Sequence, residues 1–461
     1  MDKQFNVPRI LIGATGSGSG KTTITCGLLK AFSDMGRRVR AYKCGPDYID
    51  PMFHTRVLGI PSANLDLYFN DENTIRYLLD RPSDLAVMEG VMGYYDGIGG
   101  ISARGSAFDL ATVTETPSVL IIDGKGKSVS IVAEIKGFLE YRENSGVRGV
   151  ILNRVSPSIY GDLKKIIEAE LGIRVFGFFP VMEKACLESR HLGLVTADEI
   201  GNLNEIIEQI SRQAEETVDL DGLLSLAEEA KPLTYTLPEI HKGSAVRIGI
   251  AKDNAFCFYY NDNLALLEEM GAELISFSPV AGDPLPADLD GLLLGGGYPE
   301  LYLHALSENQ GLKTAIAESI EKGMPCLAEC GGFMYLHQWI EDECGERYPM
   351  TGILEGGCFP IGKLNRFGYL DMVLNEDTVA GCAGTAFKAH EFHYWDSENP
   401  GKAAHGQKPL RKRNWDAMVS YKNLLGGFPH IHYYTNLKLA ENFLEACRAY
   451  GKTRGDAAVE I

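Results

Sequence analysis

The sequence predicts an α/β protein of two domains, and three observations support this prediction. The chain has 461 residues, which is too long for one ordinary hydrophobic core. Short apolar runs that end in Gly or Asp alternate with segments of helical period, as expected for parallel sheets covered by helices. This pattern stops near residue 216 and starts again at Val246. We therefore expect domains at 1–215 and 246–450, a linker at 216–245 and a tail at 451–461.

The two domains show the alternation through separate sets of apolar segments. The first domain contains RILIG, DLAVMEG, SVLIID and GVILNRV, and the second begins with VRIGIA, DGLLLGGG and MPCLAE. Between them lie an acidic helical segment and a polar stretch with prolines, which we interpret as the linker. The sequence contains no internal repeat and no low-complexity tract.

Composition and charge limit the classes of partner. The net charge of -18 argues against nucleic acid, because phosphate neutralisation requires clustered Lys and Arg. The first twenty residues lack the apolar run and cleavage pattern of a signal peptide, and no segment approaches the length of a membrane span. Ten cysteines without a C-x-x-C pair indicate reduced thiols. We expect a cytoplasmic protein with no nucleic-acid partner and no membrane segment.

A glycine-rich loop lies between the first strand and the first helix. The loop reads GATGSGSGKTT and follows PRILI. In this context the amides of Gly16, Gly18 and Gly20 can surround phosphates, Lys21 can reach the terminal phosphate oxygens and Thr22 can hold Mg²⁺. The strict motif has a glycine six residues before the lysine, where this chain has threonine. The first domain is therefore predicted to be a P-loop NTPase domain that binds ATP and Mg²⁺.

Acidic residues at strand ends are candidates for a second magnesium ligand. Glu89 ends the strand DLAVME, and Asp47 and Asp50 lie in the polar loop YKCGPDYIDPMFH. Carboxylates at the carboxyl edge of a parallel sheet lie beside the P-loop. We predict that Glu89 and Asp47 are metal ligands. For Asp50 two roles stay open, a metal ligand and a helix cap.

Three other polar residues are candidates for ligand binding. Lys43 ends a strand and can offset substrate or phosphate charge. Asn153 ends the strand in GVILNRV and can read the edge of a nucleotide base. Arg190, in CLESRHLGLV, can bind the carboxylates of a substrate, although a surface ion pair is an open alternative.

The second domain contains a cysteine in the context of a nucleophile elbow. MPCLAECGGFMYLHQWI predicts a strand, a sharp turn at Cys330 and a helix, with small residues Ala328 and Gly332 on either side. At a helix N-terminus the dipole is expected to lower the pKa of the thiol. The amide of Gly331 can combine with the glycines of LLLGGGYPEL, including Gly296, to form an oxyanion hole.

Four histidines are candidates for the general base. His390 and His393 lie in AHEFHYW, and His430 and His432 lie in FPHIHYY. Residues two apart on a strand share a face, so each pair can point to one side. Metal binding by these histidines is an open alternative.

Nine segments occur in the order found in the cobyrinate a,c-diamide synthase family, and the chain resembles that family nearly end to end. These segments are GATGSGSGKTT, KCGPDYIDPMFH, NLD, MEGVMGYYDG, SRHLGL, GGGYPE, ECGGFMYL, HEFHYW and HIHYY. The N-terminal half is also similar to dethiobiotin synthetase, whose P-loop shares the departure from the strict motif seen here at Thr15. The C-terminal half resembles class I glutamine amidotransferase domains.

The resemblance implies a glutamine-hydrolysing ligase with a Cys330–His430 dyad. Class I domains place a glutamate two residues after the histidine, whereas this chain has His432 there. The implied partners are glutamine and cobyrinate, whose a and c acetate groups are amidated with ATP. Nickel sirohydrochlorin, a related tetrapyrrole polycarboxylate, is an alternative acceptor. The oligomeric state, including a homodimer, stays open.

A P-loop ATPase switch with a non-catalytic C-terminal binding module is the alternative from another class. Switches of the partitioning type have a second lysine early in the loop, where this chain has Gly16. Such a protein would also have no use for an elbow cysteine. Both features favour the ligase.

Overall fold

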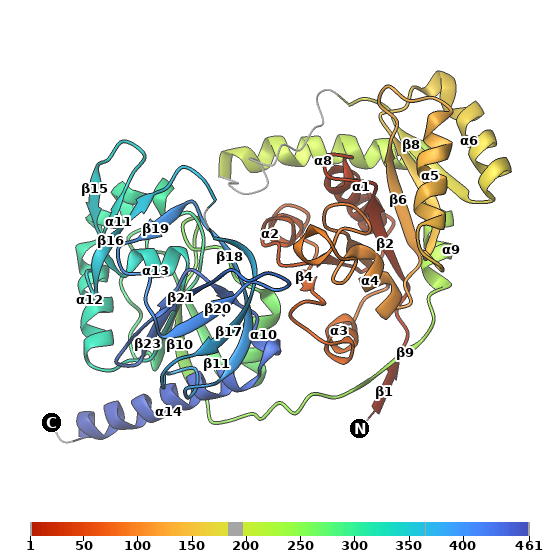
Figure 1. The fold of residues 1–461 in the computed structure, drawn as a ribbon. Helices are drawn as coiled ribbons and strands as arrows, with labels where there is room; N and C mark the ends of the chain where they lie inside the picture. The colour runs from red at the N-terminus through yellow and green to blue at the C-terminus, as the bar shows by residue number, and fades with distance from the viewer. Residues whose placement is uncertain (1, 183–196, 365, 460–461) are drawn as a thin grey trace. The chain divides into compact units, whose positions relative to one another are not determined.

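The computed structural model describes residues 2–182, 197–364 and 366–459, and the chain divides into two compact units (Figure 1). The first unit is Met1–Pro238 and the second is Glu239–Ile461. Each unit contains a parallel sheet and helices, so the predicted α/β class is confirmed.

The first unit is built on a seven-stranded parallel sheet with the order β4-β3-β5-β2-β6-β7-β8. Its strands are β2 (Arg9–Ala14), β3 (Val39–Cys44), β4 (Ser62–Leu65), β5 (Leu85–Glu89), β6 (Ser118–Asp123), β7 (Val147–Asn153) and β8 (Arg174–Phe179). Its helices are α1 (Lys21–Asp34), α2 (Ile49–Arg56), α3 (Glu72–Leu79), α4 (Ala107–Val113), α5 (Ser130–Glu140), α6 (Pro157–Leu171), α8 (Ala197–Thr217) and α9 (Leu220–Glu228), with a short 3₁₀ turn, η1 (Ile98–Gly100). Because the strands are parallel, the segments that follow β2, β3, β5 and β7 meet at one edge of the sheet.

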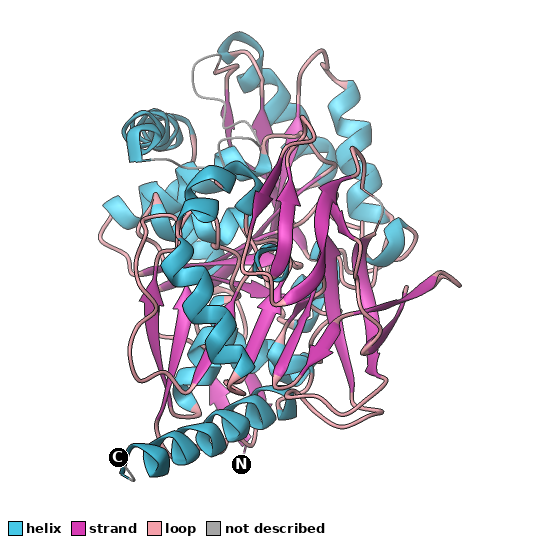
Figure 2. Ribbon diagram, turned by 90° about the vertical axis from the view of Figure 1, so that its left-hand side faces the viewer, coloured by secondary structure: helices cyan, strands magenta, loops and turns pink. Residues whose placement is uncertain are grey.

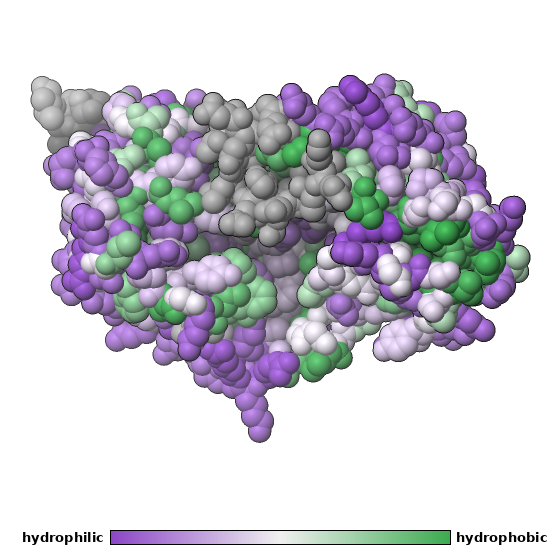
Figure 3. All heavy atoms as spheres, turned by 90° about the horizontal axis from the view of Figure 1, so that it is seen from above, coloured by the Kyte–Doolittle hydropathy of each residue, from purple (hydrophilic) through white to green (hydrophobic). Residues whose placement is uncertain are grey.

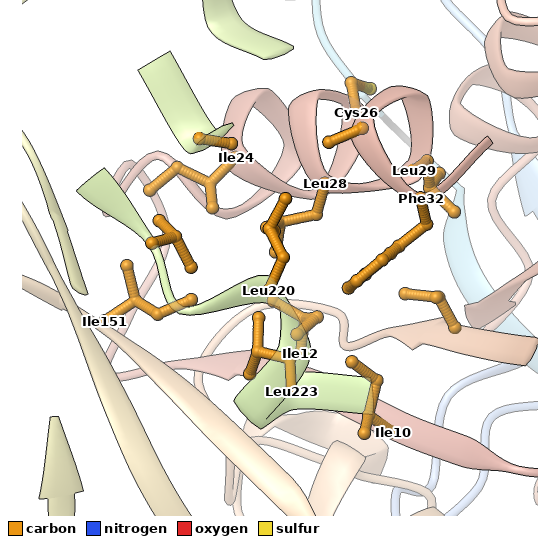
Figure 4. Close-up of a cluster of buried hydrophobic side chains, with 14 of the residues drawn as sticks. Ile10, Ile12, Ile24, Cys26, Leu28, Leu29, Phe32, Ile151, Leu220 and Leu223 are labelled. Atoms are coloured by element: carbon orange, nitrogen blue, oxygen red, sulfur yellow. The ribbon is translucent and has the colours of Figure 1, made fainter. Parts of the chain in front are cut away.

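The segment predicted to be a linker begins inside the first unit. Figure 4 shows Leu220 and Leu223 of α9 within the same hydrophobic cluster as Ile10 and Ile12 of β2. Beyond α9, strand β9 (Leu233–Thr236) pairs antiparallel with β1 (Asp2–Phe5). The structure thus differs from the expected boundary at 215, because the apolar side of this acidic helix packs on the sheet.

The second unit contains a six-stranded sheet with the order β11-β10-β12-β13-β23-β22, in which only the edge strand β22 is antiparallel. These strands are β10 (Val246–Ala251), β11 (Ala272–Phe277), β12 (Gly291–Leu294), β13 (Cys326–Glu329), β22 (Val419–Tyr421) and β23 (Leu424–Gly427). The helices are α10 (Asn261–Glu269), α11 (Leu303–Glu308), α12 (Gln310–Glu321), α13 (Gly331–Tyr335) and α14 (Lys438–Val459), with 3₁₀ turns η2 (Pro299–Leu301) and η3 (Tyr433–Thr435).

Two smaller sheets complete the second unit. One has the order β15-β14-β16-β19, and the other has the order β21-β20-β17-β18-β24. Their strands are β14 (His337–Glu341), β15 (Arg347–Pro349), β16 (Leu354–Pro360), β17 (Phe367–Leu374), β18 (Ala386–Phe392), β19 (Trp395–Ser397), β20 (Ala404–Gln407), β21 (Asn414–Ala417) and β24 (His430–Ile431). The strands of these two sheets, apart from β24, therefore all lie between Cys330 and His430 in the sequence.

The described chain ends in a long helix, α14. Figure 2 shows α14 as one continuous helix near the C-terminus, so the expected tail at 451–461 begins inside a helix. On the face shown in Figure 3, hydrophilic residues predominate and hydrophobic residues form smaller patches. In the described part of the chain, no helix is long and apolar enough to cross a membrane.

Candidate functional site

The glycine-rich loop joins β2 to α1, as the sequence predicts. Gly18 and Gly20 have φ angles of 77° and 86°, a region that side chains with a Cβ rarely adopt. A Cβ on Gly20 would also lie 2.2 Å from Nδ2 of Asn153. Gly16 has neither constraint, because a Cβ there would meet nothing within 4 Å. The backbone thus requires glycine at 18 and 20.

Two residues at the end of β7 support this loop. Asn153 donates from Nδ2 to the carbonyl of Ser19 at 2.8 Å, and its Oδ1 accepts the N–H of Arg154. Arg154 donates to the carbonyl of Gly18 at 2.9 Å and to Asp123 at 2.8 Å. Asn153 therefore holds the P-loop backbone in place, and recognition of a base by Asn153 stays a prediction. The contact of Arg154 with the P-loop was not predicted from the sequence.

A buried cluster of charged residues lies at the start of α1. Glu89 accepts a hydrogen bond from the Thr22 hydroxyl at 2.6 Å and another from Lys43 Nζ at 2.8 Å. Lys43 also pairs with Asp50, and Lys21 Nζ lies 3.8 Å from Glu89. Glu89 is fully buried and the side chain of Lys43 is 3% exposed. The structure thus places Lys43 inside the acidic cluster.

The charges of Lys43 and Glu89 stabilise one another, whereas Lys21 is destabilised in its charged form. Burial alone would lower the pKa of Lys43, but attraction to Asp50 and Glu89 outweighs burial and raises it. Burial would raise the pKa of Glu89, but Lys43 and Lys21 outweigh burial and lower it. Burial lowers the pKa of Lys21, and repulsion from Lys43 lowers it further. Phosphate oxygens placed near Lys21 would offset this repulsion.

The oxygen atoms of this cluster fit a magnesium ion bound together with a nucleotide. Among the described residues, Glu89 Oε2 is a buried oxygen without a hydrogen-bond partner. The Thr22 hydroxyl lies 2.6 Å from Oε1 of that carboxylate and 3.5 Å from Asp50. Asp47 instead accepts the N–H of Ile49 at 2.8 Å with its Oδ1. Mg²⁺ prefers a few protein oxygens together with phosphates and water, and Thr22 and Glu89 match this preference.

The second unit contains the predicted elbow. β13 ends at Glu329, Cys330 has φ 45° and ψ -103°, and α13 starts at Gly331. A non-glycine residue with this φ is strained, which is typical of functional turns. A Cβ on Gly332 would lie 2.1 Å from the carbonyl oxygen of Leu294, so only glycine fits there. The packing explains the small residue two positions after the cysteine.

Cys330, His430 and Gly296 lie together, although they are far apart in the sequence. A Cβ on Gly296 would lie 2.4 Å from Cε1 of His430 and 3.4 Å from Cβ of Cys330. A Cβ on Gly331 would lie 3.1 Å from the amide nitrogen of Gly297. Gly297, the third glycine of the GGG segment, therefore lies close to Gly331, and Gly296 leaves space for the histidine ring.

Two of the other candidate histidines, His390 and His393, have different surroundings from His430. His390 lies opposite His430 in the β18–β24 pair, and burial lowers the pKa of His390 to about 3. His393 bonds Glu391 at 2.8 Å and stacks on Phe428. In the described part of the chain, no group of three or more His, Cys, Asp or Glu side chains could hold a metal ion. The alternative of a histidine metal site therefore has no support there.

The predicted lowering of the Cys330 pKa is wrong. Burial raises the pKa of this thiol above its ordinary value, and the carboxylates of Glu300, Glu391 and Glu329 raise it further. The bond from the Gly331 amide acts in the opposite direction but is outweighed. α13 has only five residues, so its dipole is weak. The thiol is neutral until a base removes its proton.

We expect Cys330 to react slowly with iodoacetamide at neutral pH, because only the thiolate is nucleophilic. Its alkylation rate should still be rising at about pH 9, above the ordinary thiol pKa of ~8.5. Peptide mass spectrometry without glutamine measures this rate, with the exposed Cys382 as an internal reference. Faster alkylation of Cys330 than of Cys382 at about pH 7 would contradict the neutral thiol.

Glu329 is a site residue that the sequence analysis missed. Its Oε2 lies 3.2 Å from Nδ1 of His430, and its Oε1 accepts the N–H of Ile431 at 3.2 Å. No carboxylate before the cysteine was predicted from the sequence to contact His430. The available indication was the glutamate directly before the cysteine in AECGG.

One predicted substrate residue cannot be placed. Arg190 lies outside the described residues. Binding of a substrate carboxylate by Arg190 stays a prediction.

Comparisons with known proteins agree with the division into two sites. Residues 10–194 match the CobQ/CobB/MinD/ParA nucleotide binding domain, and residues 247–437 match the CobB/CobQ-like glutamine amidotransferase domain. Among curated proteins, the chain is similar to cobyrinate a,c-diamide synthase of Caldanaerobacter subterraneus subsp. tengcongensis, with 39% identity over 96% of this chain and 99% of that protein. Proteins of the same name from Priestia megaterium and Thermoplasma volcanium are 36% and 38% identical. These two alignments cover 97% and 98% of this chain, and 99% of each relative.

Proposed function

The chain belongs to the cobyrinate a,c-diamide synthase family of glutamine-hydrolysing ligases, and we propose that it converts cobyrinate to the a,c-diamide. The observation that carries the proposal is the presence of two sites on one chain. The first unit has Lys21, Thr22 and Glu89 at a P-loop, and the second has Cys330 beside His430. A nucleotide site and a glutaminase site are the parts that an ATP-dependent amidation requires.

In the first unit, the proposed chemistry is formation of an acyl phosphate on an acetate carboxylate of the acceptor. Lys21 neutralises charge on the transferred phosphoryl group, and the P-loop amides hold the phosphates. Thr22 and Glu89 would hold Mg²⁺, which supplies further charge neutralisation when bound. Lys43 keeps Glu89 ionised, because the two side chains form a buried ion pair. Ammonia then displaces phosphate and leaves an amide.

In the second unit, the proposed chemistry is release of ammonia from glutamine. The sulfur of Cys330 attacks the side-chain amide of glutamine and forms a thioester, while His430 accepts the thiol proton. The backbone amides of Gly331 and of the nearby GGG segment would bind the oxyanion, and the short distance between Gly331 and Gly297 supports this role. Water then hydrolyses the thioester, which restores the thiol and yields glutamate.

The identity of the acceptor is tested by incubating the protein with ATP, Mg²⁺, glutamine and one macrocycle at a time. We expect a diamide from cobyrinate. Nickel sirohydrochlorin carries similar acetates and is the second candidate acceptor. If a diamide forms from nickel sirohydrochlorin and not from cobyrinate, nickel sirohydrochlorin is the substrate and the proposal for cobyrinate is wrong.

We expect one synthetase site to perform both amidations in order, with release of a monoamide between them. The chain carries one P-loop and one elbow cysteine, so a rigid macrocycle must leave and rebind in a turned position. A mass-spectrometric time course should show a monoamide that rises and then falls, with two ATP consumed per acceptor. Added labelled monoamide should be converted to diamide. Diamide from the first turnover, without exchangeable monoamide, would refute the single-site scheme.

A further inference from the structure

The histidine of a cysteine–histidine pair needs a partner for its second ring nitrogen. Such a partner fixes the tautomer and stabilises the imidazolium that forms when the thiol loses its proton. Two residues after His430 the chain has His432, which packs edge-on against Tyr260 with ring centroids 5.1 Å apart. Burial lowers the pKa of His432 to about 3, so its ring stays neutral. His432 therefore cannot supply the negative charge.

Glu329 supplies a carboxylate from a different part of the chain. One oxygen lies 3.2 Å from Nδ1 of His430, and the other accepts the N–H of Ile431 at 3.2 Å. The exposed fractions of the Glu329 and His430 side chains are 13% and 2%. The two oxygens bond consecutive residues of β24, which fixes the carboxylate relative to the imidazole ring.

Sheet pairing explains how this contact forms. β13 and β23 are parallel neighbours, with Glu329 opposite Gly427. The amide of Cys330 also bonds the carbonyl of Gly427 at 2.7 Å. The chain that leaves β23 therefore passes beside the end of β13 and brings His430 next to Glu329. The same two strands position the nucleophile, the base and the carboxylate.

We propose that Glu329 is the positioning residue for His430, and that the site is a Cys330–His430–Glu329 triad in which the carboxylate precedes the nucleophile. The inference rests on the proposed glutaminase function and deepens it. Glu329 accepts the Nδ1–H of His430, so that the lone pair on Nε2 is available to the thiol of Cys330. Its negative charge then stabilises the imidazolium.

The proton follows a closed path in this scheme. As sulfur bonds to the amide carbon of glutamine, the thiol proton moves to Nε2 of His430. The carbon–nitrogen bond then breaks, and the same proton goes to the leaving ammonia. Water attacks the thioester while His430 takes a proton from water and returns one to sulfur. Glu329 takes no part in these proton transfers and acts through His430.

The demand for such a carboxylate is large in this protein. Burial and three carboxylates raise the pKa of Cys330, so the thiol resists loss of its proton. Stabilising the imidazolium is therefore the remaining way to favour proton transfer. Glu391, which is also buried nearby, already bonds His393 at 2.8 Å and Trp415 at 3.2 Å. Glu329 contacts Nδ1 of His430 at 3.2 Å.

The test replaces Glu329 in the full-length protein and measures glutamine hydrolysis and ammonium-dependent synthesis separately. Glu329→Gln keeps the size of the side chain but has no charge and one acceptor oxygen for two donors. We expect kcat for glutamine hydrolysis to fall on the order of 10²-fold or more, with KM for glutamine within about twofold. Ammonium-dependent synthesis should be unchanged. Glu329→Asp keeps the charge and should retain more activity than Glu329→Gln.

Asp416→Asn is the matched control, because Asp416 is an exposed carboxylate that bonds His405 at 2.8 Å in the same unit. It should have wild-type values in both assays. Wild-type kcat in Glu329→Gln would overturn the proposal, as would equal losses with glutamine and ammonium. A wild-type protein that does not hydrolyse glutamine would instead refute the proposed function itself.

Discussion

Replacing Cys330 with alanine is expected to abolish product formation from glutamine and to leave product formation from ammonium intact. In the proposed reaction the thiol serves only the release of ammonia, and alanine has no nucleophilic atom to replace the sulfur. The loss with glutamine should be on the order of 10³-fold or more. Initial rates of diamide formation with saturating glutamine, and then with high ammonium, measure the two effects.

Cys326→Ala is the matched control for this substitution. Cys326 lies on the same strand, β13, and is fully buried. Removal of its sulfur should cost about 1 kcal/mol of stability and leave glutamine-dependent synthesis nearly unchanged. If Cys330→Ala is folded but has also lost ammonium-dependent synthesis, the division of tasks between the two units is incorrect.

Lys21→Ala and Glu89→Gln are expected to reduce synthesis from glutamine and from ammonium alike, each on the order of 10²-fold or more. Lys21 Nζ lies 3.8 Å from the buried Glu89, which also bonds Thr22 and Lys43. In the proposed reaction both side chains act where charge develops on the transferred phosphoryl group. Glutamine hydrolysis without acceptor is expected to survive, because Cys330 and His430 belong to the other unit.

Lys30→Ala provides the control for charge removal. Lys30 lies on the same helix, α1, where it pairs with Asp34 and Glu208 on a partly exposed face. Its loss should change stability by about 0.5 kcal/mol or less and should not change synthesis. Near wild-type synthesis in both Lys21→Ala and Glu89→Gln would remove the P-loop from the proposed reaction. Thermal unfolding of each variant checks that the fold is retained.

Local sequence determined those features that depend on residues close together in the chain. The P-loop follows from a strand, a glycine-rich turn and a helix in succession, and the structure has these elements at β2 and α1. The elbow at Cys330 follows in the same way from a strand, small residues and a helix. Such features are predictable because φ and ψ preferences and steric crowding act over a few residues.

The domain boundary and the environment of Lys43 depended on burial. The acidic segment after residue 216 was interpreted as a linker, although its leucines pack against β2 (Figure 4). The structure pairs Lys43 inside the protein with Asp50 and Glu89, which the sequence does not indicate, and the offset of substrate or phosphate charge by Lys43 stays a prediction. Composition cannot reveal the packing of α9 or the burial of Lys43, because it does not show which residues of a segment face the core.

The sequence by itself predicted two local features, the glycine-rich loop before α1 and the sharp turn at Cys330, since each is written in a short continuous motif. The tertiary structure alone decided that Glu329 contacts His430, 101 residues further along the chain. It also decided that the thiol of Cys330 is neutral, because its buried surroundings outweigh a five-residue helix. The physical reason is that strand order and burial set these distances and charges, and sequence spacing encodes neither.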